Sequence, residues 1–238
     1  MYKIRARYTK TDMMKFISHL DLVRLMQRAL RRAGVSMVFS QGFNPHPKLS
    51  FATALSVGVS SEGEYMDVEI KDFIEIEIFK EKINHALPDG IKIIQCKYID
   101  PKAAALMATI DYSSYLVRLR LENPIQENAI KANLEHFTSL EEIRIHKKTN
   151  KRNNEKEKEI NIRTYIHSVE IFSLTEEELI LKMVLATGSR GNVKPDAVVQ
   201  SLVEIEGIAI DYQQIRIHRL ELYSVTDGKM VSPLGDNS

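Results

Sequence analysis

Residues 18–34 read SHLDLVRLMQRALRRAG and carry the clearest helical pattern in the chain. Apolar side chains recur three and four positions apart, which is the spacing of one buried helix face. They are Leu22, Met26, Ala29, Leu30 and Ala33. Ser18 followed by Asp21 resembles a capping box, and Gly34 is a typical helix stop. We therefore predict an amphipathic helix that packs on a sheet and ends at Gly34.

The segments on either side of this helix predict the sheet. Residues 2–10 alternate apolar and basic side chains, which is the pattern of a half-buried strand. Further strands are predicted over 35–40, 48–58, 64–70 and 91–99, with a helix over 76–90. We expect 48–58 and 64–70 to form a hairpin. This order of strands and helices is typical of the ferredoxin-like, split β-α-β fold.

A similar set of elements follows a connector at residues 100–108. Strands are predicted over 113–121, 141–148, 159–172, 177–186 and 208–224, and helices over 124–137 and 194–205. The predicted fold is therefore α+β, with two ferredoxin-like halves that have antiparallel sheets. The corresponding domains are 1–105 and 106–238.

Two polar segments are expected to lie outside these elements. Residues 146–159, HKKTNKRNNEKEKE, are predicted to be a solvated hairpin tip or mobile loop. A basic arm that binds nucleic acid is the alternative, although glutamates interrupt its lysines. Residues 231–238, VSPLGDNS, are predicted to be a frayed tail.

Composition limits the class of protein. Cys96 is the only cysteine of 238 residues, which excludes a disulfide framework and a cysteine-held iron–sulfur cluster within this chain. We expect a cytoplasmic protein without a membrane segment, since no stretch is apolar and long enough to span a bilayer. Net charge is +1, yet residues 1–60 hold ten Lys/Arg against two acidic residues, and residues 61–100 hold ten acidic residues against five lysines. The amino-terminal quarter is thus the basic pole.

Four arginines share one face of the predicted helix over 18–34: Arg24, Arg28, Arg31 and Arg32. Like charges one turn apart repel one another unless an anion lies against them. Guanidinium groups bind phosphate oxygens in pairs, so the stripe favours a polyanion, RNA above all. We expect Lys3, Arg5 and Arg7 on the neighbouring strand to flank it. An acidic patch on a protein partner, the acidic part of this domain, or plain solvation are the alternatives.

The segment SQGFNPHPKLSF, residues 40–51, predicts a stiff loop beside the stripe. Each proline fixes its own φ and favours extended geometry in the residue before it. The side chains presented in this way are Phe43, Asn44, His46 and Lys48. An aromatic ring beside amide and imidazole groups suits an unstacked base, so we predict contact with a nucleotide. For Phe43, insertion into the core is the alternative.

Other possible sites have weaker patterns. His19 and His46 are candidates for acid–base catalysis of metal-independent RNA cleavage or group transfer. With Asp21 they lack a recognised metal spacing, so no metal site is predicted. In the glycine-rich segment ATGSRGNVKPD, residues 186–196, Arg190 and Lys194 are candidates for phosphate contact ahead of a helix. A plain strand-to-helix turn is the alternative there.

Several stretches resemble a known family. They are FISHLDLVRLMQRALRRAGV (16–35), FSQGFNPHPKLSFATALSVGVSSEGEYMDVEI (39–70), INIRTYI (160–166), GSRGNVKPDAVVQSL (188–202) and RLELY (219–223). The chain is similar there to the radical-SAM-linked family of bacterial proteins of unknown function, a domain found alone or fused to the carboxy-terminus of radical SAM proteins. Thr164 departs from that pattern, in which proline is expected.

The resemblance implies a radical SAM protein as partner and an RNA-related setting. S-adenosylmethionine and the iron–sulfur cluster would belong to that partner alone, because one cysteine cannot hold a three-thiolate cluster; no cofactor is expected in this chain. We therefore predict a non-catalytic accessory module that binds structured RNA, tRNA or rRNA, for modification or processing. The alternatives are a domain that docks on the radical SAM protein without RNA, and a nuclease or transferase that uses His19 and His46.

Overall fold

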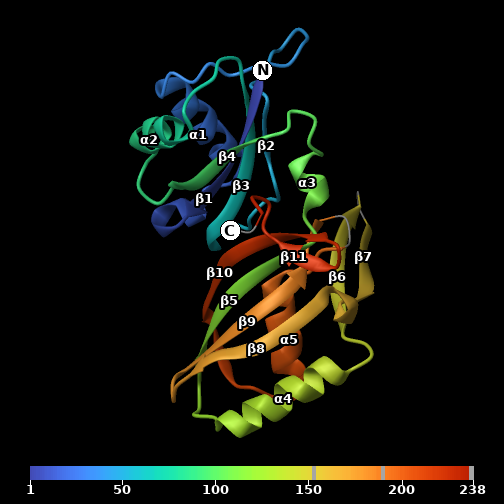
Figure 1. Cartoon of the computed structure of the whole chain (residues 1–238). Coiled ribbons are helices and arrows are strands. Elements are labelled where there is room, and N and C mark those ends of the chain that lie inside the picture. The colour runs from blue at the N-terminus through green and yellow to red at the C-terminus, as the bar shows by residue number, and fades with distance from the viewer. Residues whose placement is uncertain (152–153, 189–190, 236–238) are drawn as a thin grey trace. The chain divides into compact units, whose positions relative to one another are not determined.

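The computed structural model describes residues 1–151, 154–188 and 191–235. The fold is α+β, and the chain forms two compact units (Figure 1). Unit 1 comprises Met1–Tyr112 together with His218–Ser238, and unit 2 comprises Ser113–Ile217. The carboxy-terminal residues therefore belong with the first part of the chain, whereas a single boundary near residue 105 was expected from the sequence.

Unit 1 is built around the strand β1. Its elements are β1 (Tyr2–Lys10), η1 (Asp12–Phe16), α1 (His19–Arg32), β2 (Leu49–Phe51), β3 (Ser60–Ile70), α2 (Ile76–Ala86), β4 (Ile93–Ile99), α3 (Leu106–Thr109), β11 (Lys229–Val231) and the second half of β10 (Ile210–Thr226). The strands follow the order β4-β1-β3-β10, with β2 beside β3 and β11 beside β10. The sheet is mixed, since β10 pairs with β3 in parallel and the other described pairs are antiparallel.

The helices α1 and α2 lie on one face of this sheet (Figure 1). Alternate residues of β1, namely Ile4, Ala6 and Tyr8, point into the core that the helices cover. The buried face of α1 contributes Leu22, Met26 and Leu30, and α2 contributes Phe79 and Ile83. The helix predicted from residues 18–34 is confirmed, with Ser18 as its N-cap and Gly34 at a φ of 70°.

The region between α1 and β3 contains less strand than predicted. Residues 35–40 form only isolated bridges, Met37 with Ile70 and Phe39 with Pro47. Of the strand predicted over 48–58, only β2 is present, paired with β3 through Leu49↔Val68 and Phe51↔Met66. The hairpin prediction holds for this short piece alone. Valine and phenylalanine favour strands, but outside β2 this region makes only a few backbone hydrogen bonds to β3, among them Val38 N–H to the Glu69 carbonyl and Ala52 N–H to the Tyr65 carbonyl.

Unit 2 alternates strands and helices in the same way. Its elements are β5 (Tyr112–Leu121), α4 (Glu127–Ser139), β6 (Arg144–Lys151), β7 (Asn154–Asn161), η2 (Arg163–Tyr165), β8 (Ile166–Leu174), β9 (Glu178–Ala186), α5 (Pro195–Glu206) and the first half of β10. The strand order is β10-β5-β9-β8, and β6 and β7 form a separate antiparallel pair. The helix α4 packs against α5 and β8.

One prediction in unit 2 needs correction. The single strand predicted over 159–172 is interrupted by η2, so that β7 and β8 are separate strands. Residues 146–159 were predicted to be a hairpin tip or mobile loop, and the hairpin alternative fits the structure: the described residues among them form the distal part of the antiparallel pair β6 and β7.

The segment after β11 returns to the face of the unit 1 sheet opposite α1 and α2. Leu234 is only 3% exposed, and the Pro233 carbonyl accepts a hydrogen bond of 3.1 Å from Arg5 Nη1. Lys97 Nζ donates to the Leu234 carbonyl. The prediction of a frayed tail is therefore wrong for residues 232–235.

Candidate functional site

The helix α1 presents its arginines on an exposed face. Ser18 Oγ accepts a hydrogen bond of 3.2 Å from the Asp21 backbone N–H, which fixes the first turn. Leu22, Met26 and Leu30 face the core. A residue two positions after each of them lies on the opposite side of the helix and faces outward. All four predicted arginines are exposed: Arg24, Arg28, Arg31 and Arg32.

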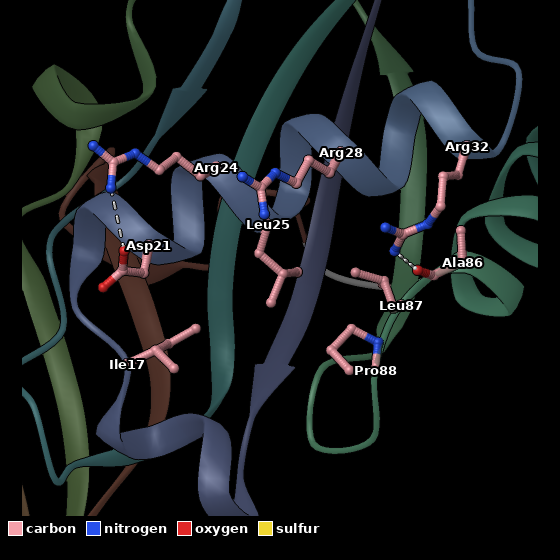
Figure 2. Close-up of a pocket in the computed structure, with 9 residues that line it drawn as sticks. All are labelled: Ile17, Asp21, Arg24, Leu25, Arg28, Arg32, Ala86, Leu87 and Pro88. Atoms are coloured by element: carbon pink, nitrogen blue, oxygen red, sulfur yellow. Dashed lines mark hydrogen bonds and ion pairs between the residues drawn. The ribbon is translucent and has the colours of Figure 1, made fainter.

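Three of these arginines border one groove of about 550 Å³ (Figure 2). Arg24, Arg28 and Arg32 follow one another at intervals of four residues, about 6 Å of helix rise each. The groove lies between α1 and the loop that follows α2, where Leu87 and Pro88 line it. Arg31 does not line it.

The two ends of the arginine row have partners and the middle does not. Arg24 Nη1 lies 3.4 Å from Asp21 Oδ1, and both side chains are more than half exposed. Arg32 Nη2 donates to the Ala86 carbonyl at the end of α2, where the helix dipole is negative. In the part of the chain that the structure describes, Arg28 has no hydrogen-bond or ion-pair partner. Its positive charge is uncompensated at the centre of the groove.

Apolar side chains form the floor of the same groove. Ile17, Leu25, Leu87 and Pro88 are half-buried, and the first three also pack against the core of unit 1. Figure 2 shows Leu25 pointing from α1 toward the space between Ile17 and Leu87. This floor was not predicted from the sequence. Leu87 and Pro88 are more than 50 positions from α1, and no local sequence pattern links these two residues to that helix. A second hollow of about 580 Å³ lies beyond Arg32, with Glu81, Lys82 and His85 on its wall.

The loop over residues 40–48 is closed by its own hydrogen bonds. Ser40 N–H donates to the His46 carbonyl at 2.8 Å, and Ser40 Oγ accepts from His46 N–H at 3.0 Å. Phe43 is fully exposed and does not enter the core. Lys48 Nζ lies 3.0 Å from Glu69 Oε2 in an ion pair.

The structure does not bring this loop to the arginine groove. Residues 43–48 are all described, and none of them, including Asn44 and His46, lines the groove.

His19 and His46 share no hydrogen bond or ring contact in the described part of the chain. The His19 ring packs edge-on against Phe51, with 5.5 Å between ring centroids. His46 lies in the loop over residues 40–48, where its backbone N–H and carbonyl are both bonded to Ser40. No described interaction brings the two imidazoles to one site.

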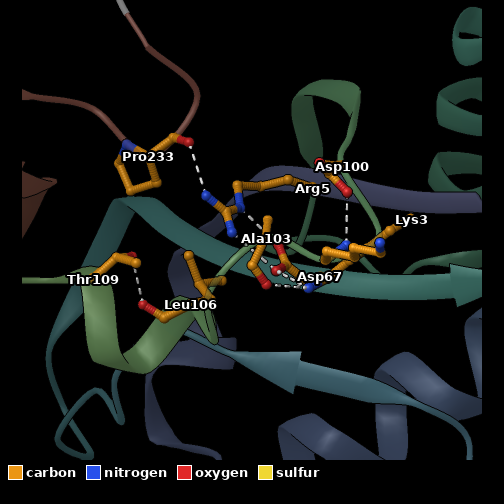
Figure 3. Close-up of polar contacts among 9 residues, drawn as sticks. Lys3, Arg5, Asp67, Asp100, Ala103, Leu106, Thr109 and Pro233 are labelled. Atoms are coloured by element: carbon orange, nitrogen blue, oxygen red, sulfur yellow. Dashed lines mark hydrogen bonds and ion pairs between the residues drawn. The ribbon is translucent and has the colours of Figure 1, made fainter.

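The basic residues of β1 lie elsewhere than expected. Lys3 and Arg5 are buried on the sheet face opposite α1, where both contact Asp67 (Figure 3). The Arg5 guanidinium binds that carboxylate through two hydrogen bonds of 2.7 and 3.0 Å. Arg7 lies 3.1 Å from Glu221 Oε2. Internal carboxylates thus neutralise these cations, and they do not flank the arginine row.

A buried polar cluster at the other end of β1 was not predicted. Glu64 Oε1 accepts from Arg219 Nη1 at 2.9 Å, and Lys10 Nζ donates to the carbonyls of Lys15 and Ile17. Burial lowers the pKa of Lys10 and raises the pKa of Tyr8 well above its usual value. Lys10 therefore ties η1 to β1 and fixes the start of α1. Lys10 continues the alternation of Ile4, Ala6 and Tyr8, and this position in the sequence could have indicated that its side chain is buried.

The glycine-rich segment before α5 is described only in part. Arg190 lies outside the described residues. Lys194 is exposed at the N-cap position of α5, and its side chain makes no capping hydrogen bond. Pro195 occupies the first turn of the helix, where its missing N–H costs no hydrogen bond.

The described residues lack two features, a metal-binding cluster and a membrane-spanning helix. No group of three or more His, Cys, Asp or Glu side chains there is arranged to hold a metal ion. No described helix has both the length and the apolar composition needed to cross a bilayer.

Comparison with solved structures shows the fold class. A chain from the crystal structure of a Cbf5-Nop10-Gar1 complex superposes with a TM-score of 0.53 at 10% identity, over 92% of this chain and 48% of that one. A chain from the archaeal box H/ACA sRNP Nop10-Cbf5 complex gives a TM-score of 0.47 at 10% identity, over 91% and 46%. This chain thus spans about half the length of both. At this identity the first similarity shows a shared α+β fold alone.

Sequence comparison shows the family. No curated protein matches this chain. The model of the family described as "uncharacterized protein conserved in bacteria", DUF2344, matches residues 3–195, which include α1, the groove and most of unit 2. The chain is therefore a member of the DUF2344 family of bacterial proteins.

Proposed function

We propose that this protein is a non-catalytic module that binds RNA phosphates along α1 and acts with a radical SAM enzyme in modification or processing of tRNA or rRNA. The observation that carries the proposal is the uncompensated Arg28 at the centre of a groove bordered by Arg24 and Arg32. The radical SAM partner comes from the sequence resemblance, and S-adenosylmethionine and the iron–sulfur cluster would be held by that partner.

Electrostatics favours an anion in this groove. Guanidiniums at intervals of four residues on a helix repel one another. Asp21 relieves the charge at Arg24 and the end of α2 relieves it at Arg32, but nothing described does so at Arg28. A phosphate there would meet a planar fork of donors, which matches its oxygens in pairs. A further phosphate of the same strand would reach Arg32.

Salt-dependent RNA binding tests the proposal. Arg28→Glu is compared with Arg216→Glu, which makes the same charge change at an exposed arginine of unit 2. We expect Arg28→Glu to weaken binding and to reduce the slope of log K against log[salt] by about 0.7 for each single-strand phosphate that the variant no longer neutralises. Arg216→Glu should leave affinity and slope nearly unchanged. Equal effects of the two variants would refute the proposal.

The loop over 40–48 is proposed as a separate RNA contact, because it displays Phe43 on a hydrogen-bonded frame. Asn44, His46 and Lys48 would add polar contacts to the same nucleotide. Phe43→Ala should then weaken RNA binding without changing the salt slope, since the uncharged ring neutralises no phosphate. An unaltered affinity would remove the loop from the interface.

A second candidate function is direct docking on the radical SAM protein. Met13, Phe16 and Leu20 are each more than half exposed, close together in sequence at the start of α1. Exposed apolar groups that cluster commonly mark protein interfaces. Capture of the radical SAM protein from nuclease-treated lysate, abolished in Phe16→Ser/Leu20→Ser and kept in Arg28→Glu, would favour this function over RNA binding.

We also propose the finer fold assignment, two ferredoxin-like units. The order β4-β1-β3-β2 in unit 1 and the order β10-β5-β9-β8 in unit 2 are both compatible with a split β-α-β arrangement. An experimental structure in which either order differs would contradict this assignment.

A further inference from the structure

We infer that the arginine groove takes an unpaired nucleotide of single-stranded RNA, with the base on the apolar floor and the phosphate on Arg28. This inference rests on the proposed function and adds the strandedness of the RNA. It follows from the composition of the groove, which combines a row of cations with apolar side chains that line the same space.

The floor residues and the arginines of the row line the same groove. Leu25 projects from the same helix as Arg24 and Arg28, while Leu87 and Pro88 face it from the loop after α2 (Figure 2). The floor residues are held from below, because Leu25 and Leu87 pack on the core. A volume of about 550 Å³ lies in the range of small-ligand sites and accommodates a nucleotide.

A duplex would not use this floor. In A-form RNA the bases are paired and stacked, and side chains meet phosphates and 2′-hydroxyls instead. A duplex lying on the arginine row would therefore leave Leu25, Leu87 and Pro88 facing polar groups or water. An unpaired base has two apolar faces. When one of them packs on the floor, that face and the floor residues are both removed from water.

The charges also give the nucleotide a direction. Asp21 lies at one end of the groove, where its carboxylate accepts hydrogen bonds from Ser18 Oγ at 2.7 Å and from Arg24 at 3.4 Å. This negative charge disfavours a phosphate beside it. The phosphate is therefore placed near Arg28 and Arg32, and the base extends over the floor below them.

The test compares three RNAs by fluorescence anisotropy with the chain of residues 1–238. They are a single-stranded 12-mer, the same 12-mer in a blunt duplex, and a single-stranded 12-mer with abasic residues throughout. We expect the first to bind at least about tenfold more tightly than the other two, which corresponds to about 1.4 kcal/mol. Equal affinity for all three, with a salt slope that falls in Arg28→Gln, would overturn the inference and leave the proposed function standing. Arg28-independent binding, or no binding of any RNA, would overturn both.

Variants of the floor give a second measurement. Pro88→Ser and Leu25→Ser should each lower affinity for the intact single strand and leave affinity for the abasic strand and the salt slope unchanged. Ile205→Ser is the matched control, because Ile205 is an exposed aliphatic residue of α5 outside the groove. Urea denaturation checks that each variant is folded. If the floor variants weaken intact and abasic strands equally, the base does not lie on the floor and the inference fails.

Discussion

Glu64 and Arg219 form a buried ion pair that joins two parts of the chain 155 positions apart. The distance between Glu64 Oε1 and Arg219 Nη1 is 2.9 Å, and the side chains are 2% and 5% exposed. Arg219 also donates to Thr53 Oγ1 at 3.2 Å. The pair connects β3 to the parallel strand β10 within unit 1.

Removing one partner of this pair should be costly. We expect Arg219→Ala to lower the free energy of unfolding by about 3–5 kcal/mol, because it leaves the Glu64 carboxylate buried and unpaired. Urea denaturation measures the change. Arg24→Ala is the control: its pair with Asp21 is 67% and 57% exposed, so the cost should stay below about 1 kcal/mol. Similar destabilisation in both variants would contradict the prediction.

Gly63 in β3 allows the close approach of β10. A methyl group at this position would lie 2.6 Å from the Glu221 Cα and also against the Leu220 carbonyl. We expect Gly63→Ala to destabilise the protein by about 2–3 kcal/mol, since backbone atoms must shift. Gly34→Asn should cost less than about 1 kcal/mol, because nothing lies within 4 Å and asparagine tolerates positive φ. Thermal unfolding compares the two, and an equal shift in Tm would refute the explanation.

The cap at Ser18 determines where α1 begins. Ser18→Ala should lower the free energy of unfolding by about 1 kcal/mol, because the Asp21 N–H is left without its acceptor. Ser18→Thr retains a hydroxyl and should recover most of that stability. Circular dichroism during urea unfolding measures both variants. A stability of Ser18→Ala equal to that of the parent would show that the cap contributes nothing.

Cys96 should react slowly with alkylating reagents. Burial raises the pKa of its thiol to about 11, and the thiolate is the reactive form. At pH 8 we expect iodoacetamide to modify the folded protein about 200-fold more slowly than a free cysteine with a pKa near 8.5. Because the thiolate fraction grows tenfold per unit below the pKa, the rate should rise in the same proportion up to about pH 10. Mass spectrometry follows the reaction, and a native rate equal to the rate in 8 M urea would contradict the prediction.

Local patterns predicted the elements whose hydrogen bonds are local. The helix α1 followed from apolar spacing, Ser18 and Gly34, all within 17 residues. Residues 35–40 have a similar strand-like composition to β4, yet they form two bridges instead of a strand. Strand formation there depends on whether β3 offers a free partner along its length, and the sequence does not contain that information.

The candidate site was predicted in part: the arginine row was expected from the sequence, and the burial of Lys3 and Arg5 was not. The arginine row follows from helical periodicity, and the structure places three of its four members on one groove. Lys3 and Arg5 alternate with apolar residues as predicted, but their polar face is covered and paired with Asp67. The alternation in β1 shows that the strand has two different faces, but it does not show whether the basic face is exposed to water. That depends on Asp67 and on the segment over 232–235, which are distant in sequence and cover this face.

The division of unit 1 into two chain segments has a consequence for its synthesis. A ribosome translates residues 113–217 before it reaches the second half of β10, so the nascent chain offers β3 no parallel neighbour during that time. The hydrogen bond from Arg5 to the Pro233 carbonyl likewise forms only after Pro233 has been synthesised. Unit 2 is continuous in sequence, so it can fold before the last residues of unit 1 have been synthesised. Unit 1 is therefore completed last.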